Sequence, residues 1–383
     1  MYTVSFNDSI DKIPASQWNQ LCQTDYPFIQ HAFLRALEHS GSVSAETGWQ
    51  PMHMTLHQHN TIVGVMPLYI KNHSYGEYVF DWSWADAWAR QGLNYYPKLV
   101  TAIPYTPAQG PRMGSSLPEP EALSLFHEAI QKLIVETGAS SWHGLFVPES
   151  TKEHMNYPQC AARMGLQYHW CNDAYRDFDH YLSCFSSRKR KNLRKERHKV
   201  QQQGIQHHWV TGSEIDSDAL ERFWVFYQMT HFKRGRRGYL TKRFFEELID
   251  SMGEQLLFCF ACHQQEYVAG ALFFKDHQTL YGRYWGASKA FDGLHFETCY
   301  YQGIEYAIKH GLNRFDPGAQ GEHKIARGFK PITTWSVHHI DDAGFAQAVQ
   351  NFVKDEAEEL RHIQYELSKA LPFRQNDETV SPD

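Results

Sequence analysis

Residues 255–275, QLLFCFACHQQEYVAGALFFK, contain two apolar runs joined by the polar turn Gln264-Gln-Glu266. Two such runs on either side of a short polar turn are typical of a β-hairpin. An apolar strand pattern follows at 279–287, then a helical pattern at 296–310 and a short strand at 312–316. The order hairpin, strand, helix, strand predicts an α/β unit built on a mixed sheet.

A similar series of elements occurs earlier in the chain. A hairpin is expected over 51–59 and 61–71, a helix over 119–137 and a strand over 141–147. The run TIVGVMPLYIK that begins at Thr61 can be aligned with YVAGALFFK of the second hairpin. The shared order of elements favours an internal duplication over chance.

Two domains are the default expectation for 383 residues, because one core seldom organises a chain of this length. We predict an N-terminal domain over 1–170, a C-terminal domain over 171–345, a helix over 346–370 and a disordered tail over 371–383. Further helices are expected at 14–23, 30–39, 151–164, 187–203, 217–232 and 241–252, and further strands at 1–6, 205–210 and 333–340.

The composition is that of an ordinary globular protein, with 42% hydrophobic and 21% charged residues and a net charge of −6. The N-terminus lacks a secretory signal, and no apolar run is long enough to cross a bilayer. The seven cysteines fit a reducing compartment, so we expect a soluble cytoplasmic protein without stable membrane insertion. The 23 histidines are scattered, and we predict no metal site.

Two stretches carry a family resemblance. One contains Phe80-Asp-Trp-Ser-Trp-Ala-Asp-Ala-Trp88 and Pro104-Tyr-Thr-Pro-Ala-Gln-Gly-Pro-Arg112; the other runs from His295-Phe-Glu-Thr-Cys-Tyr-Tyr301 to FDPGAQGEHKIARGFKP at 315–331. Together they resemble the FemAB-like branch of GNAT N-acyltransferases, the peptidoglycan biosynthesis or recognition proteins. The resemblance implies tandem GNAT-like α/β domains, with mixed central sheets flanked by helices. Relatives in the Fem group transfer amino acids from aminoacyl-tRNA onto an amine of a peptidoglycan precursor.

The resemblance leaves the donor open. The nearest match to the coenzyme A loop of GNAT enzymes, Arg283-Tyr-Trp-Gly-Ala-Ser288, is expected within a strand. The segment ahead of the following helix, Asp292-Gly-Leu-His-Phe-Glu297, carries two acids, which compete with phosphate for the helix N-terminus. Acyl-coenzyme A and aminoacyl-tRNA therefore both remain candidate donors, and no cofactor is assigned.

The loop after residue 316 is the first candidate site, because ligands collect beyond strand ends in sheet proteins. Glu322 or His323 could deprotonate an attacking ammonium, and Lys324 or Arg327 could hold a carboxylate, phosphate or oxyanion. Ordinary salt bridges in a helix-capping loop are the alternative. Arg283 is a further candidate for substrate binding.

A second candidate site lies in the N-terminal half. Asp81, Trp82 and Asp86, with Tyr105 and Arg112, could form an amphipathic slot for an amine acceptor, or only an aromatic core with surface acids.

Glu297 is a single candidate near the start of the C-terminal half's helix. It is either a general base or an acid that the helix dipole favours.

The expected helix over 187–203 carries eight cations within twelve residues, including Arg190 and Arg194. Such density favours contact with an anionic partner, which could be tRNA, coenzyme A or a nucleotide-linked precursor; a solvated surface helix is the alternative.

The favoured interpretation is direct acyl transfer to an amine in a gap between two diverging strands of the C-terminal half. An acetyl-coenzyme A-dependent N-acetyltransferase, a non-catalytic recognition protein for cell-wall precursors and a nucleic-acid binder are the rivals. The favoured interpretation would not survive if the strands around Tyr281 and Phe315 were paired along their whole length with no cavity beside Glu322 to Arg327.

Overall fold

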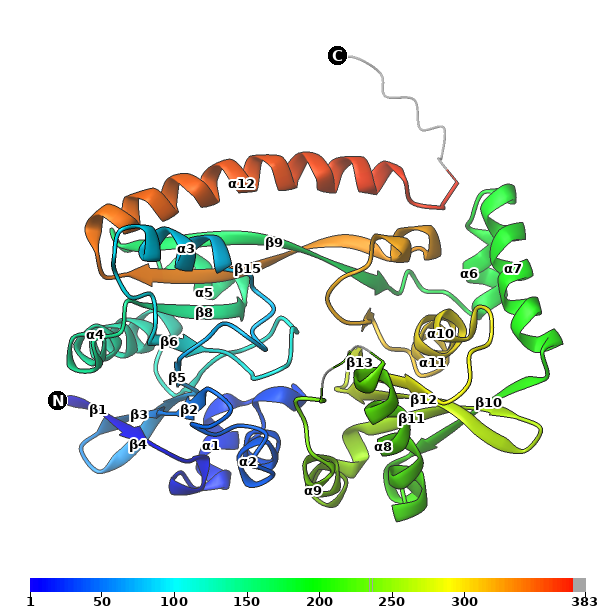
Figure 1. The fold of residues 1–383 in the computed structure, drawn as a ribbon, viewed down its shortest axis with the longest axis horizontal. Helices are drawn as coiled ribbons and strands as arrows, with labels where there is room; N and C mark the ends of the chain where they lie inside the picture. Colours follow the sequence, from blue (N-terminus) through cyan, green and yellow to red (C-terminus); the bar gives the residue numbers. More distant parts are fainter. Residues whose placement is uncertain (234, 236, 375–383) are drawn as a thin grey trace, which may run out of the picture.

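Eleven strands form one continuous sheet that runs through both halves of the chain (Figure 1). The computed structural model describes residues 1–233, 235 and 237–374. The strand order is β10-β11-β12-β13-β14-β9-β15-β8-β6-β5-β2, and a second sheet has the order β1-β3-β4-β7. The fold is mixed α/β, with helices flanking the sheets.

The N-terminal half contains nine strands and five α-helices among the described residues. The strands are β1 (Tyr2–Asn7), β2 (Trp49–Pro51), β3 (His53–Gln58), β4 (Thr61–Met66), β5 (Tyr69–Lys71), β6 (Lys98–Thr101), β7 (Gly114–Ser115), β8 (Ser141–Val147) and β9 (Cys160–Cys171). The helices are α1 (Ala15–Cys22), α2 (His31–His39), α3 (Trp82–Arg90), α4 (Glu119–Thr137) and α5 (Glu149–His154).

The C-terminal half repeats the main order of elements. Its strands are β10 (Ile205–Thr211), β11 (Leu256–His263), β12 (Glu266–Lys275), β13 (Thr279–Ala287), β14 (Arg314–Asp316) and β15 (Lys330–Ile340). Its helices are α6 (Phe178–Ser183), α7 (Ser187–Gln202), α8 (Ser217–Phe232), α9 (Lys242–Met252), α10 (Leu294–Phe296), the π-helical segment η5 (Glu297–Tyr301), α11 (Gln302–Lys309), the 3-10 segment η6 (Glu322–Arg327) and α12 (Ala343–Lys369).

The repeat is visible in the strand pairing. β1 pairs antiparallel with β3, as β10 does with β11. α4 then leads into β8, which is parallel to β6, and α11 leads into β14, which is parallel to β13. The expected α/β fold class, with two similar halves and mixed sheets flanked by helices, is confirmed.

The two halves exchange strands at their junction. β9 pairs antiparallel with β15 from His169 opposite Lys330 to Cys160 opposite His339. β15 also pairs with β8, and β9 also pairs with β14, so each long strand belongs to both halves. α12 packs across β9 and β15 on the outside (Figure 1).

One apolar core crosses the junction as well. Phe28 and Phe33 of the N-terminal half lie edge-on to Phe274 of β12, with ring centroids 5.0 and 5.8 Å apart. Phe33 also meets Phe244 of α9 at 5.6 Å. Burial of aromatic rings across the junction holds the two halves together as one packed body.

The prediction of a helix over 151–164 is wrong. α5 ends at His154, and residues from Cys160 onward form β9, the longest strand of the described chain. The prediction treated Gly165 as a helix stop, whereas Gly165 lies inside the strand opposite Thr334 of β15. Residues 162–170 alternate apolar and polar side chains, as a strand does, and pairing with β15 fixes them in that conformation.

Most other elements lie within a few residues of their predicted bounds, but β2, β6, β7, α3 and α6 were not anticipated. The single strand expected over 61–71 is two strands, β4 and β5, which belong to different sheets. From residue 375 onward, the tail expected over 371–383 lies outside the described residues. Within the described residues, none of the helices combines the length and the apolar character that a membrane span requires.

Candidate active site

Strands β13 and β14 run together for three residues and then separate. Thr279, Leu280 and Tyr281 pair with the three residues of β14, but β13 continues to Ala287 without a strand on that side among the described residues. After Asp316 the chain turns away as Pro317 and Gly318. A gap therefore opens beyond Tyr281, although the strands are paired at Tyr281 and Phe315 themselves and none of the residues from Glu322 to Arg327 lines the cavity beside it.

A β-bulge marks the point of separation. Leu272 of β12 lies opposite Tyr284, whereas Phe273 lies opposite Gly282, so Arg283 is the extra residue on β13. Bulges re-aim side chains and occur next to active sites. Here the bulge occurs within two residues of Tyr281, the last residue of β13 that pairs with β14.

A cavity of about 590 Å³ opens beside the separated strands, at the junction of the halves. The C-terminal half contributes Arg283, Tyr284, Trp285, His295, Tyr227, His231, Tyr239 and the loop 318–320; the N-terminal half contributes Ser74, Tyr75, Gly76, Trp82 and Tyr105. A smaller cavity of about 120 Å³ between β12, β13 and η5 shares Arg283, Tyr284, Trp285 and His295 with it.

Aromatic rings dominate the wall of the larger cavity. Tyr105 stacks on Tyr239 at 4.9 Å with an interplanar angle of 13°, and Tyr75 lies 5.2 Å from Trp82. Stacked aromatic faces attract ammonium groups and planar amides. The cavity suits an acceptor with an amine on an organic body.

A buried ion pair forms the base of the gap. Arg283 donates to Asp316 of β14 at 2.7 Å, and both side chains are almost fully buried. Burial acts to raise the pKa of Asp316, but the charge of Arg283 outweighs it and holds this pKa well below its usual range. Burial lowers the pKa of the neighbouring His169 to about 4, so His169 is neutral at pH 7. Arg283 Nε has no hydrogen-bond partner among the described residues.

Lys324 and Arg327, two predicted binding residues, lie behind this wall. Lys324 is 2% exposed, and its Nζ donates to the carbonyl oxygen of Gly318 at 2.7 Å. Burial lowers the pKa of Lys324 to about 8. Arg327 donates to Glu196 at 2.7 Å and lies 3.6 Å from the centre of the Phe296 ring. Both residues brace the loop 318–320 and the base of α10.

The predicted bases Glu322 and His323 face outward. Both are exposed in η6, and neither belongs to the residues that line the 590 Å³ cavity. His323 Nε2 lies 3.1 Å from the hydroxyl of Tyr300. The short 3-10 turns bury Lys324 and Arg327 and leave the two residues before Lys324 on the surface.

Glu297 begins the π-helical segment η5 and is 4% exposed. Arg197 of α7 binds it with two nitrogens, at 2.7 and 3.0 Å, and Gln302 donates to it at 2.9 Å. A carboxylate held in this way is a structural anion, and the geometry gives Glu297 no access to the cavity lining.

The predicted N-terminal slot is divided. Asp81 is buried and bonded to Lys98 and to the hydroxyl of Tyr95. Trp82 is 40% exposed and lines the cavity, whereas Asp86 is exposed on α3. Of the acids and aromatics expected there, Trp82 and Tyr105 reach the cavity.

Arg112 is buried and bonded to the backbone alone. Its guanidinium donates to the carbonyl oxygens of Leu145 (2.8 Å), Ala108 (2.6 Å) and Gly110 (3.0 Å). The structure places this predicted binding residue inside the N-terminal sheet, away from the cavity lining.

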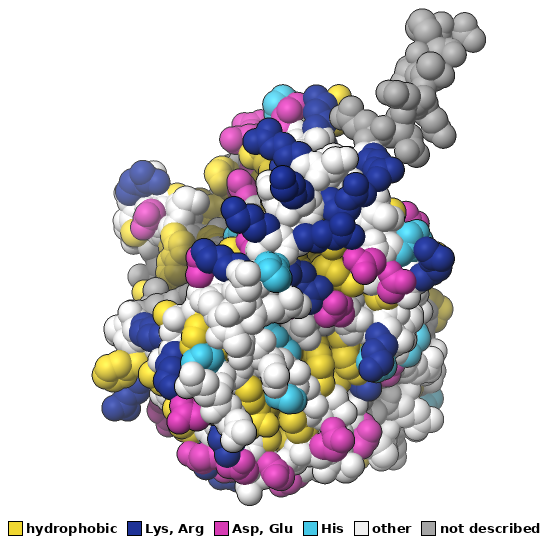
Figure 2. Space-filling model, turned by 90° about the vertical axis from the view of Figure 1, so that its right-hand side faces the viewer, with side chains coloured by type: hydrophobic (Ala, Val, Ile, Leu, Met, Phe, Trp, Pro, Cys, Tyr) yellow, Lys and Arg dark blue, Asp and Glu magenta, His cyan; other side chains and the backbone are white. Residues whose placement is uncertain are grey.

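Lys and Arg side chains gather on the face that carries α7 (Figure 2). Arg194 is exposed and makes a 3.2 Å contact with Asp179, and Arg190 is half-buried. Arg197 instead turns inward to Glu297 and Glu305. The predicted basic helix is present, with most of its charge facing solvent.

Sequence reasoning missed much of the cavity wall. His231, Tyr227 and Tyr239 come from the end of α8 and the loop after it, and Tyr284 and His295 come from either side of the β13–α10 connection. His295 lies within the stretch that carries the family resemblance, which was the available signal. The others lie far apart in sequence, and only the fold brings them together.

Comparison with known proteins adds three solved structures of low identity. The chain matches a domain (DUF2156) of a protein named as a lysylphosphatidylglycerol synthetase from Agrobacterium fabrum (10% identity, 88% of this chain and 94% of that chain, TM-score 0.55). It matches a conserved protein of unknown function from Bacteroides thetaiotaomicron (9%, 88% and 100%, 0.53) and L-PGS from Bacillus licheniformis (10%, 84% and 96%, 0.50). These likenesses concern the fold alone. No curated protein matches the sequence.

The family model described as FemAB-like, peptidoglycan biosynthesis/recognition, matches residues 9–375, nearly the whole chain.

Proposed function

Since the chain belongs to the FemAB-like family, we propose that it is an N-acyltransferase that moves an acyl group from an activated donor onto an amine. The observation that carries this proposal is the separation of β13 from β14 beside a cavity at the junction of the halves. Unpaired backbone groups at such an opening accept a carbonyl donor as a sheet edge accepts a peptide.

The donor carbonyl lies against β13 beyond Tyr281 in this proposal. Backbone N–H groups there stabilise the oxyanion of the tetrahedral intermediate, and the buried Arg283–Asp316 pair holds this part of β13 in place. The Arg283–Asp316 pair is fixed before substrate arrives, so this part of β13 needs no reorganisation during the reaction.

The acceptor amine lies in the aromatic part of the cavity and attacks the carbonyl directly. His295 lines both the larger cavity and the small cavity beside β13, so it can reach a group held between them. We assign to His295 the removal of the ammonium proton. When the tetrahedral intermediate collapses, the bond between the acyl carbon and the donor's oxygen or sulfur breaks, and the donor leaves as its alcohol or thiol with a proton. This assignment replaces Glu322 and His323, which face solvent, and Glu297, which is bound to Arg197.

Aminoacyl-tRNA fits the donor side better than coenzyme A. The N-terminus of the helix that begins at α10, where a pyrophosphate would bind, is covered by the end of α7. Gln203 donates to the carbonyl oxygen of Asp292 at 3.0 Å, and Lys199 binds the Asp292 carboxylate. A Cβ at Gly293 would lie 3.1 Å from Val200. Helix α7 also presents a basic outer face that can bind a polyanion (Figure 2).

The acceptor that we propose is an amine of a peptidoglycan precursor. The family description supports this choice, and the aromatic wall formed by Tyr105, Tyr239 and Trp82 is compatible with a peptide carrying an amine.

The test is a matched set of transfer assays. The purified chain is incubated with aminoacyl-tRNA or with acyl-coenzyme A, each with a nucleotide-linked peptidoglycan precursor, and products are identified by mass spectrometry. An aminoacylated precursor that requires the tRNA donor supports the proposal. Acetylation from acetyl-coenzyme A would support the rival donor, and absence of transfer from every donor, with precursor binding retained, would establish a recognition protein.

A further inference from the structure

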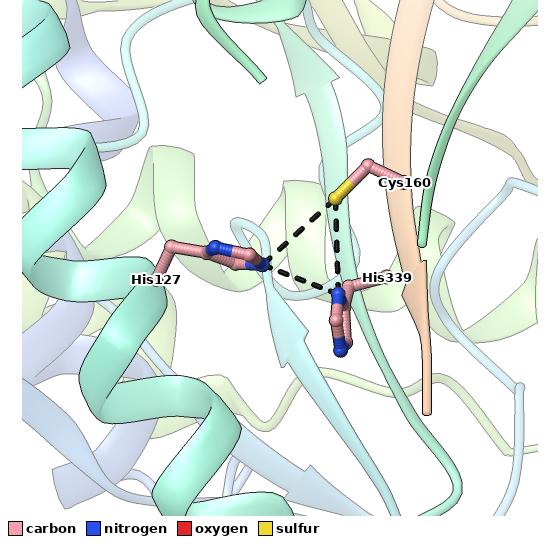
Figure 3. A group of neighbouring side chains, drawn as sticks. All are labelled: His127, Cys160 and His339. Atoms are coloured by element: carbon pink, nitrogen blue, oxygen red, sulfur yellow. Dashed lines mark hydrogen bonds between the residues drawn. The ribbon is translucent and has the colours of Figure 1, made fainter. Parts of the chain in front are cut away.

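Three side chains from distant parts of the sequence converge on one another (Figure 3). His127 comes from α4, Cys160 is the first residue of β9, and His339 is near the end of β15. All three are buried, at 5%, 8% and 1% exposure. None lines the 590 Å³ cavity, so the cluster is separate from the proposed active site.

The distances within the cluster match a tetrahedral metal site. His127 Nε2 lies 3.2 Å from His339 Nδ1, and Cys160 Sγ lies 3.8 Å from each of these nitrogens. Zinc bonds of about 2.0–2.1 Å to nitrogen and about 2.3 Å to sulfur place tetrahedral ligand atoms roughly 3.3–3.6 Å apart. One ion therefore fits between the three atoms after shifts of a few tenths of an ångström.

The β-sheet register explains why these atoms meet. Cys160 and His339 are directly opposite each other in the β9–β15 pair, so their side chains share one face of the sheet. α4 presents His127 to the same face. Tyr157 stacks on the His127 ring at 4.5 Å, and Trp142 lies 6.4 Å from it, so aromatic rings surround the cluster.

Hydrogen bonds within the cluster satisfy its three buried side chains poorly. A sulfur–nitrogen separation of 3.8 Å is a weak hydrogen bond, and the group must share its few protons among three atoms. His339 Nε2 has no partner among the described residues, whichever ring nitrogen carries the proton. Metal ligation would satisfy His339 Nδ1 and place the proton on Nε2, whose N–H then has no acceptor among the described residues.

We propose that His127, Cys160 and His339 bind one Zn²⁺ ion, with a water molecule in the fourth position. Binding releases the thiol proton of Cys160 to solvent, and the thiolate and two neutral imidazoles supply the ligands. The ion would fasten the exchanged strands β9 and β15 to α4. Its role is structural, because the site is buried and apart from the cavity.

The test uses the full-length chain and needs no enzymatic activity. Protein stripped with a chelator is reloaded with Zn²⁺, passed through a desalting column and assayed for metal by mass spectrometry. We expect about one equivalent in the wild type and in Cys171→Ser, a matched control at the other end of β9. We expect loss of the ion in Cys160→Ser and in His127→Gln, and a higher melting temperature with Zn²⁺ only where the site is intact.

Cobalt gives a second readout that does not depend on the stability of the variants. Co²⁺ bound at this site should show a thiolate-to-metal charge-transfer absorption in the near ultraviolet, present in Cys171→Ser and absent in Cys160→Ser. Zinc that stays bound at equal stoichiometry in Cys160→Ser, or wild-type protein that retains none and shows no charge-transfer band, would overturn the proposal. Neither result bears on acyl transfer, so the two proposals fail independently.

Discussion

Each half of the molecule contains a pair of parallel strands that separate, but the two openings are treated differently. In the N-terminal half, β6 and β8 pair over three residues, and then β8 continues to Val147 with β15 on one side and no strand of the described residues on the side of β6. The chain itself fills that gap: Gly110 N–H donates to Phe146 O at 3.1 Å, Gln109 to Val147 O at 3.1 Å and Arg112 to Leu145 O at 2.8 Å. In the C-terminal half, the gap beside β13 opens into the cavity.

The two openings between parallel strands therefore differ in whether they can bind a ligand. A closed opening satisfies its own backbone groups and has none left for a ligand. The open one keeps donors free for a carbonyl. The N-terminal half lines one side of the cavity, through Ser74, Tyr75, Gly76, Trp82 and Tyr105.

The largest effect that this comparison predicts is on catalysis in the C-terminal half. His295→Gln should lower kcat about 10²- to 10⁴-fold, because a positioned general base contributes on that order. The melting temperature should change little, and the ionisation of the base should disappear from the pH profile of kcat. The matched control is His208→Gln, an exposed histidine on β10. Equal loss of activity in both variants, or an unchanged pH profile in His295→Gln, would remove the assignment.

The second prediction concerns the closed opening. Arg112→Ala should lower the free energy of unfolding by about 4 kcal/mol, because the buried carbonyls of Leu145 and Ala108 lose a charged donor. Urea unfolding measures this loss. The folded fraction should keep its kcat. Arg112→Lys should recover only part of the stability, since one ammonium group cannot donate to all the carbonyl oxygens that the guanidinium reaches. A variant as stable as the wild type, or one that is folded but inactive, would contradict the division of roles.

Local pattern was enough to predict most of the elements that build both openings. The bounds of α4, β8, α8 and β13 agree with the hydrophobic periodicity and with stop signals such as Gly138, whose φ of 65° suits a glycine. β9 was not predicted, although its pattern is present. Its residues 162–170 do alternate, with apolar side chains at even positions and Arg163, Gly165, Gln167 and His169 between them, but the expected helix was extended to Gly165 over the first part of this pattern.

The candidate site was only partly predictable from the sequence. The loop 318–327 was recognised, but its composition could not tell which side chains face inward, and η6 buries Lys324 while exposing Glu322. Arg283 was identified as a candidate, whereas the bulge that places it depends on pairing with β12. Arg112 fills the N-terminal gap by donating to backbone carbonyl oxygens, and residue types in the sequence do not indicate such contacts.

A third prediction concerns Lys324, one of two buried lysines among the residues described whose pKa is lowered, one in each half. Burial lowers the pKa of Lys71 in β5 to about 7 and that of Lys324 to about 8. The unfolded chain binds the Lys324 proton up to about pH 10.4, so between roughly pH 8 and 10.4 the unfolded state holds more protons and stability rises with pH. The unfolding free energy of the wild type, minus that of Lys324→Met, should therefore grow by roughly 3 kcal/mol from pH 7.5 to pH 10.5. Urea unfolding of both proteins at the two pH values tests this, with Lys309→Met, at an exposed lysine, as the control. If the difference between the wild type and Lys324→Met is the same at both pH values, folding does not lower the pKa of Lys324.

The smallest effect concerns the basic face of α7, which is present only in the C-terminal half. Lys191 and Lys195 are exposed, and if each contacts a phosphate of the donor tRNA, replacing either by Ala should weaken binding only a few-fold. The diagnostic quantity is the slope of log K against log salt, which should decrease in magnitude by about one per lysine removed. Lys132→Ala on α4 of the N-terminal half is the matched control and should leave the slope unchanged. If Lys132→Ala and Lys191→Ala alter the slope equally, tRNA is attracted by the protein's charge in general, and α7 does not distinguish the two halves.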